Sequence, residues 1–213
     1  MECYFPEKGI RYIAVNDGVD TGKEESAGND MSAFKAVFND FYARDVSRKV
    51  RSALTAKRRA GEFIGAWAPY GYQKDPKDHN HLIIEPEAAQ VVRQIFRWSL
   101  EGHGKQEIAK LLNDQGIPNP TRYKAEHGWA SGHPVSNSHG LWNKTTIWRI
   151  LRNEMYTGVM VQGRRKKVSY KSKALIDMPK EQWFRVEGTH EAIIDRELFQ
   201  TVQRGLDLRS KTD

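Results

Sequence analysis

The apolar positions of the chain recur mainly at intervals of three and four residues, the spacing of a helix that buries one face. This pattern predicts helices over 32–60, from Pro86 to before Gly102, over 105–115, over 144–153 and after Asp195. Short β-branched and aromatic runs at 9–15, 81–84, 157–161 and 183–186 predict strands. The sequence therefore predicts an α+β fold that is predominantly α.

The first predicted helix is unusual in its length and its charge. Ser32 is a plausible N-cap, and neither Gly nor Pro interrupts the stretch up to Ala60. A helix longer than about 25 residues usually bridges domains or pairs with a partner helix. Its second half has a single acid, Asp45, and seven cations: Arg44, Arg48, Lys49, Arg51, Lys57, Arg58 and Arg59. Because such charges repel one another, we interpret this half as a phosphate-contacting surface, with a solvated face as the alternative.

Changes in composition divide the chain into four segments. Glycines and a proline follow the long helix, and a long polar stretch over 121–141 and a basic run at 164–167 read as loops or linkers. The boundaries that we predict are 1–31, 32–60, 61–168 and 169–213. The strand near the N-terminus has no evident partner, which favours a larger domain whose N-terminal part is missing.

Net charge and cysteine usage restrict the class of protein. A formal net charge of +7 over 213 residues favours a polyanionic partner, either nucleic acid or a membrane surface. The single cysteine, Cys3, excludes an internal disulfide and any site built on paired thiolates. No apolar stretch approaches the roughly 18 residues that span a bilayer, which disfavours a membrane-spanning protein. Together with the cysteine usage, this makes the cytoplasm the expected compartment, and we expect no membrane partner.

The third and fourth predicted helices are short, amphipathic and separated by a Gly- and Pro-rich stretch, as in a DNA-reading helix pair. The polar side of the fourth helix is suited to phosphates and base edges and carries Lys144, Thr145, Thr146, Arg149 and Arg152. The nearby basic run could track a groove and comprises Arg164, Arg165, Lys166 and Lys167. The alternatives are an ordinary helical core with a polar outer side and a solvated linker.

A metal site is not expected. His79 and His81 lie in a polar turn, whereas structural zinc sites usually include cysteines at fixed spacing. Ser47 and Ser52 lie in the long helix without an obvious base partner, so we interpret them as structural.

Residues 9–20 and 41–51 resemble the end of the catalytic domain and the long helix of large serine recombinases, the integrase and transposase relatives of the resolvase/invertase superfamily. PYGY at 69–72 resembles part of the recombinase domain of that family. Five later segments resemble the same domain in order and spacing: 91–96, 108–113, 116–118, 146–153 and 156–158. Residues 188–195 resemble the entry to its zinc-ribbon domain.

The resemblance implies site-specific DNA recombination, the integration or excision of a mobile element. A serine hydroxyl attacks a scissile phosphate, and arginines stabilise the developing charge. Arg44 and Arg48 are the candidate active-site arginines. The resemblance also implies double-stranded DNA at attachment sites as the partner, dimers that form tetramers, and a nucleoid-associated bacterial protein.

The nucleophilic serine lies before residue 9 in this family, and the zinc-binding cysteines follow Asp195, so both are absent from this sequence. We therefore expect an internal fragment that binds DNA without cutting it. We expect no cofactor in it, and zinc in the downstream domain of a full-length relative. The alternative is a stand-alone helix-turn-helix-like DNA-binding regulator without catalysis.

Overall fold

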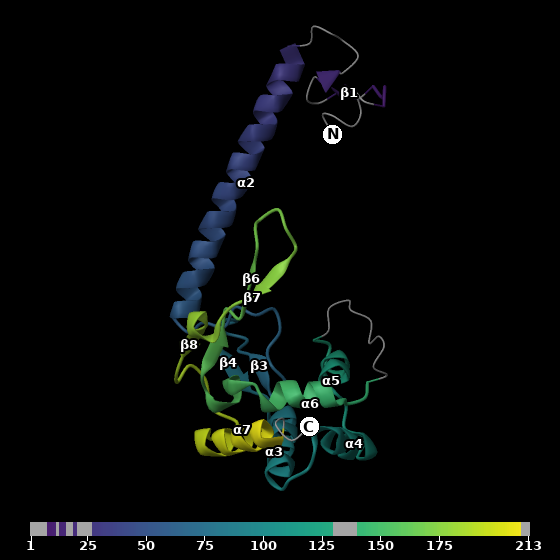
Figure 1. The fold of residues 1–213 in the computed structure, drawn as a ribbon, viewed down its shortest axis with the longest axis vertical. Helices are drawn as coiled ribbons and strands as arrows, with labels where there is room; N and C mark the ends of the chain where they lie inside the picture. Colours follow the sequence, from purple (N-terminus) through teal and green to yellow (C-terminus); the bar gives the residue numbers. More distant parts are fainter. Residues whose placement is uncertain (1–7, 12, 16–18, 21–26, 130–139, 210–213) are drawn as a thin grey trace. The chain divides into compact units, whose positions relative to one another are not determined.

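The computed structural model describes residues 8–11, 13–15, 19–20, 27–129 and 140–209 (Figure 1). Its described residues form two compact units, one from 1–54 and 167–176 and the other from 55–166 and 177–213. Long and short helices dominate, with strands of two or three residues in antiparallel pairs. The prediction of an α+β, predominantly α fold is confirmed.

The first unit contains the long helix α2, Ala27–Arg59, as far as residue 54. The helix begins five residues before Ser32, so the prediction of Ser32 as its N-cap is wrong. No proline lies between Ala27 and Ser32 to prevent helical hydrogen bonding there. The predicted N-terminal strand is present as β1, Ile13–Ala14, and it pairs with β2, Val19–Asp20. This second strand was not predicted from the sequence, because two residues carry too little periodicity.

The second unit combines helices with short strands. Its elements, in chain order, are β3 (Tyr72–Lys74), β4 (Leu82–Ile84), α3 (Pro86–Leu100), α4 (Lys105–Asp114), α5 (Pro120–Glu126), α6 (Lys144–Leu151), the 3-10 helix η2 (Glu154–Thr157), β5 (Met160–Gln162), η3 (Lys180–Gln182), β8 (Phe184–Val186) and α7 (Arg196–Arg209). Strand β3 pairs with β4, and β5 pairs with β8. A further pair, β6 (Arg165–Lys167) with β7 (Leu175–Asp177), forms a hairpin whose residues 167–176 belong to the first unit.

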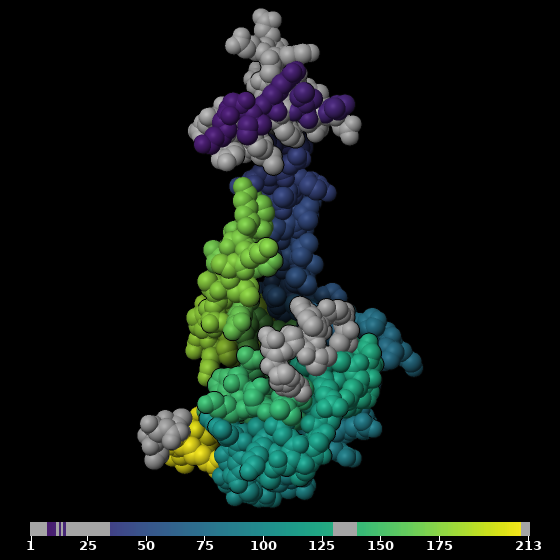
Figure 2. Space-filling view, turned by 90° about the vertical axis from the view of Figure 1, so that its right-hand side faces the viewer, coloured from purple at the N-terminus to yellow at the C-terminus, as the bar shows by residue number. Residues whose placement is uncertain are grey.

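Helix α3 organises the core of this unit. The Glu85 carboxylate accepts a hydrogen bond of 2.6 Å from the backbone of Ala88, and Pro86 opens the first turn, where no hydrogen bond is lost. The buried side chains recur at helical spacing, and Ile95 and Phe96 are completely buried. Helices α4, α6 and α7 pack on α3. In the space-filling view of Figure 2, the yellow α7 lies against the surface of the other helices.

Tyrosines join the helices to the strands. Tyr156 is almost fully buried, packs edge-on against Phe96 and stacks on Tyr72 with ring centroids 6.0 Å apart. Its hydroxyl donates to the backbone oxygen of Tyr70 at 2.8 Å, so burial leaves no unsatisfied donor there. Burial raises the pKa of the Tyr156 hydroxyl, which therefore stays protonated.

Two stretches that the sequence analysis interpreted as loops contain regular structure. Helix α5 lies within the predicted loop over 121–141; Asn119 caps it by accepting from the Arg122 backbone at 2.9 Å, and Pro120 fills its first position. The predicted basic linker contains strand β6.

The predicted helix over 144–153 ends at Leu151, because Asn153 caps η2 instead of continuing α6. Strand β3, which starts at Tyr72, is not among the predicted strands.

The segment that precedes α7 is held by a buried histidine. His190 Nε2 lies 2.7 Å from the backbone oxygen of Met155, and Nδ1 lies 2.8 Å from the hydroxyl of Thr189. The ring of Tyr72 packs edge-on against the imidazole at 4.9 Å between centroids. A neutral imidazole that donates from Nε2 and accepts at Nδ1 satisfies both contacts.

We expect the protein to lose stability as the pH falls through the range in which histidine titrates. Burial, and then the charge of His81, lower the pKa of His190, so the unfolded chain takes up this proton at a higher pH than the folded chain. The stabilisation is complete above about pH 6.5 and decreases below it. Urea unfolding between pH 5 and 7.5 measures the effect. In the variant His190→Gln the pH dependence should be shallower, and an unchanged slope would contradict the assignment.

Candidate nucleic-acid interface

Helices α4 and α6 are joined by a tryptophan that lies just before α6. Asn113 and Trp142 exchange two hydrogen bonds, from the Trp142 backbone to Asn113 Oδ1 at 2.8 Å and from Asn113 Nδ2 to the Trp142 oxygen at 3.1 Å. The indole Nε1 donates to the backbone oxygen of Ile117 at 2.9 Å. Only 3% of Trp142 is exposed, and Tyr70 packs edge-on against it. This anchor fixes where α6 begins relative to α4.

The start of α6 is capped by Asn143, whose Oδ1 accepts from the Thr146 backbone at 2.9 Å and from the Thr146 hydroxyl at 3.3 Å. The apolar residues of α6 are buried: Ile147, Ile150 and Leu151. The opposite side is exposed and carries Lys144, Thr145, Trp148 and Arg149, with Thr146 half-buried. The structure therefore brings four of the five predicted DNA-binding residues of α6 to one solvent-facing surface, which we call the α6 face. Trp148 is 47% exposed on it, although the sequence analysis assigned it no role.

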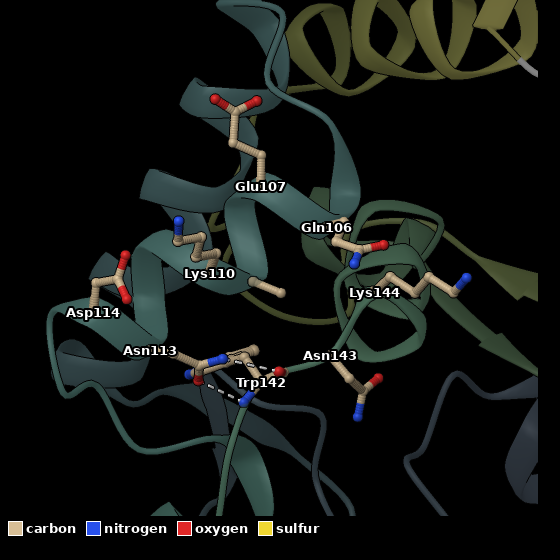
Figure 3. A pocket seen from close by; sticks show the side chains of 9 residues that line it. Gln106, Glu107, Lys110, Asn113, Asp114, Trp142, Asn143 and Lys144 are labelled. Carbon is tan, nitrogen blue, oxygen red and sulfur yellow. Dashed lines mark hydrogen bonds between the residues drawn. The ribbon is translucent and has the colours of Figure 1, made fainter.

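A hollow of about 840 Å³ lies between α4 and the start of α6 (Figure 3). It is lined by Gln106, Glu107, Ala109, Lys110, Asn113, Asp114, Trp142, Asn143 and Lys144. Figure 3 shows the hydrogen bonds between Asn113 and Trp142 at one side of this hollow. Gln106 and Lys110 extend the α6 face onto α4, and the sequence analysis missed both. The signal was available, because both occupy polar positions on a helix whose apolar residues mark its buried side.

Arg152 has partners inside the protein. Its guanidinium contacts the carboxylate of Asp207 and donates to Gln203 Oε1 at 3.1 Å, so it connects the end of α6 to α7. Gln203 in turn donates to the backbone oxygen of Leu151 at 2.7 Å. These contacts supply a structural role for Arg152, and its role in DNA binding stays a prediction.

The four residues of the predicted basic run lie at the start of the β6–β7 hairpin. The Arg164 guanidinium stacks on Trp183 at 5.0 Å from the ring centroid and reaches Asn153, just after α6, at 3.5 Å. Burial lowers the pKa of Arg164 from its usual high value. Arg165 Nε donates to Asp177 at 2.8 Å. Within the described ranges, Lys166 and Lys167 are exposed and have no carboxylate within ion-pair distance.

The two candidate active-site arginines lie one turn apart on α2 in the first unit. Arg44 lies 3.5 Å from the carboxylate of Asp40, and its side chain is largely exposed. Arg48 is exposed and lines a small hollow together with Arg44. Their proposed role in catalysis stays a prediction.

The residues weighed for metal binding form no ligand set in the described part of the chain. Among those residues, no group of three or more His, Cys, Asp or Glu is arranged to hold a metal ion. Cys3 lies outside the described residues. No helix of the described chain is long and apolar enough to cross a membrane.

Comparison with protein families adds an observation that is independent of the site geometry. The family model described as Recombinase matches residues 86–209, which is more than half of the chain and extends from α3 to the end of α7. The chain belongs to the recombinase family. This confirms the relationship to recombinases that the sequence motifs predicted.

Two solved structures are similar to the recombinase chain. One is the crystal structure of an LSR–DNA complex, with 22% sequence identity and a TM-score of 0.48, covering 77% of this chain and 39% of that one. The other concerns the sequence requirements of the Listeria innocua prophage attP site, with 22% identity and a TM-score of 0.45, covering 75% and 51%. The recombinase chain thus spans about two fifths to one half of the length of these proteins.

Proposed function

We propose that this chain binds double-stranded DNA as part of a serine recombinase that integrates or excises a mobile element at attachment sites. The observation that carries the proposal is the α6 face, in which an amphipathic helix presents Lys144, Thr145 and Arg149 to solvent on a buried support. Membership in the recombinase family supports DNA as the partner.

The chemistry of the α6 face suits a major groove. Lysine and arginine neutralise backbone phosphates, arginine also donates two hydrogen bonds to guanine, and threonine hydroxyls bond to phosphates or base edges. Gln106 and Lys110 add an amide and a cation from α4 beside the same hollow. The Trp142 anchor supports this surface, because a reading helix is specific only when its position is fixed.

We further propose that the 213 residues bind DNA without cleaving it. In the described part of the chain, Ser47 lines a small hollow with Arg44 and Arg48, and no histidine or carboxylate is among the residues that line it. A serine attacks a phosphate only when a neighbouring group activates it. We propose that Arg44 and Arg48 stabilise phosphate charge and that the nucleophile lies outside this sequence. We also propose that the full-length protein forms homodimers and tetramers.

A titration of fluorescein-labelled duplex DNA tests the proposal. We expect fluorescence anisotropy to report binding whose log affinity falls linearly with log salt between 50 and 200 mM, with a slope of about −0.9 for each phosphate neutralised. Selection from a random-sequence pool should then enrich a common site. Binding that is absent at low salt, or independent of salt, would contradict DNA binding. A protein–DNA adduct that resists denaturation in SDS would contradict the absence of cleavage.

A further inference from the structure

One large apolar side chain, that of Trp148, is exposed on the α6 face. It is 47% exposed and belongs neither to the buried core nor to the partly buried side chains that pack on it. In the part of the chain that the structure describes, no aromatic ring or cation lies against its indole, and its Nε1 donates to no acceptor. The other five tryptophans lie in the core, pack on it or have a cation over the ring: Trp67, Trp98, Trp129, Trp142 and Trp183. The packing of the protein therefore does not account for Trp148.

Cations flank this indole on the exposed side of α6. Lys144 lies one helical turn before Trp148, and Arg149 follows it directly. The helix contains no acidic residue, and among the described residues neither cation has a carboxylate within ion-pair distance. The cations attract a polyanion, whereas the indole is stabilised when apolar surface covers it. A partner that fits this face is therefore anionic at its borders and apolar opposite Trp148.

The major groove of DNA has both properties where it contains thymine. Phosphates border the groove on either side, and thymine is the base of DNA that presents a methyl group on the groove floor. Thr145 lies three residues before Trp148, so its methyl group and the indole share one side of α6. Threonine methyl groups and aromatic rings are side chains that make apolar contact with the thymine methyl.

We propose that Trp148 recognises the 5-methyl group of a thymine in the bound DNA, with Thr145 beside it. This inference rests on the proposed function and goes beyond it, because it names a base that the recognised sequence contains. Trp148 is then a specificity-determining residue of the α6 face. Cytosine carries a hydrogen where thymine carries the methyl group, so a G·C pair at the same position leaves the indole without its apolar contact.

Deoxyuridine tests this contact, because it pairs with adenine as thymidine does and lacks only the methyl group. Each thymine of the duplex selected from the random pool is replaced in turn by uracil, and fluorescence anisotropy measures the affinity of the wild-type protein at constant salt. We expect a distinct position at which uracil weakens binding about fourfold, which corresponds to the burial of one methyl group.

Variants of the protein identify the residue that contacts the methyl group. Trp148→Ala should bind the thymine duplex about tenfold more weakly, as expected for the loss of one base contact, and should no longer distinguish thymine from uracil at that position. Trp148→Phe keeps an aromatic ring and should retain part of the discrimination. Circular dichroism and urea unfolding show whether each variant is folded as the wild type is.

Trp67→Ala is the matched control. Trp67 is also 47% exposed, but it lies outside α6. Its replacement removes the same side chain at the same exposure, so the ratio of the affinities for thymine and uracil should equal that of the wild type. A ratio that is lost in Trp148→Ala and kept in Trp67→Ala supports recognition of the methyl group by Trp148.

The results separate this inference from the proposed function. If duplex DNA does not bind, the proposed function is wrong and this inference with it. If DNA binds equally well whichever thymine is replaced, or if Trp148→Ala keeps the wild-type ratio, only the recognition of a methyl group by Trp148 is overturned. If Trp148→Ala binds DNA as tightly as the wild type, the indole belongs to a contact with another partner, and the inference is also wrong.

Discussion

Replacing Trp142 with alanine is expected to lower the free energy of unfolding by about 3–5 kcal/mol, the range measured for large buried aromatic residues. The side chain is 3% exposed, packs edge-on against Tyr70 and donates to the oxygen of Ile117. Its removal leaves a cavity between α4 and α6 and frees the segment that begins α6. Urea unfolding followed by tryptophan fluorescence and circular dichroism measures the loss.

Trp142→Phe separates the packing from the hydrogen bond. Phenylalanine keeps most of the buried ring but leaves the Ile117 oxygen without its donor, so we expect a smaller loss of about 1–2 kcal/mol. If Trp142→Ala cost less than 1 kcal/mol, Trp142 would not anchor α6, and the support that we describe for the α6 face would be wrong.

Replacing Arg149 with alanine is expected to weaken DNA binding by about 1–3 kcal/mol, or roughly 5- to 150-fold in affinity. Arg149 is exposed on the α6 face and does not contribute to the buried side of the helix, so the stability of the protein should hardly change. Fluorescence anisotropy with the duplex selected from the random pool measures the affinity. Lys144→Ala should reduce the salt slope by about 1 if Lys144 contacts a phosphate.

Arg204→Ala is the control for Arg149→Ala. Arg204 is an exposed arginine of α7 that donates to the Thr201 hydroxyl within its own helix, and its removal changes the net charge equally. Equal losses in both variants would indicate general attraction of DNA to a basic protein and would contradict the assignment of the α6 face. A loss confined to Arg149→Ala would support that face as the one that contacts DNA.

The helices were predictable because each buries a stripe at helical spacing. Ala88, Val92, Ile95 and Phe96 mark α3 in the sequence as clearly as in the structure, and Pro86 marks its start. Helix α5 was missed because its seven residues bury only Tyr123, which gives no stripe. Its Asn119–Pro120 start is nevertheless a recognisable cap followed by a first-turn proline.

The candidate sites were predictable only in part. The cations and hydroxyls of the α6 face could be listed from the polar side of one helix, but Gln106 and Lys110 belong to it only because Trp142 and Asn113 bring α4 against α6. Arg152 was indistinguishable from Arg149 in the sequence, and its contact with Asp207, 55 residues later, assigns it a different environment. Tyr170 likewise reaches Asp40 across 130 residues.

The sequence by itself determined most of the helices, the family and the positions of the cationic stretches, because these follow from local spacing and from motifs in order along the chain. The tertiary structure alone decided which cations share a surface and which are neutralised. That difference has a physical reason: periodicity records which side of an element is buried, whereas the partner of a charge depends on long-range contacts that no local pattern records. The cations that give the net charge of +7 therefore lie in three kinds of surroundings. Some lie on the α6 face, some line the hollow on α2, and others pair with carboxylates within the protein.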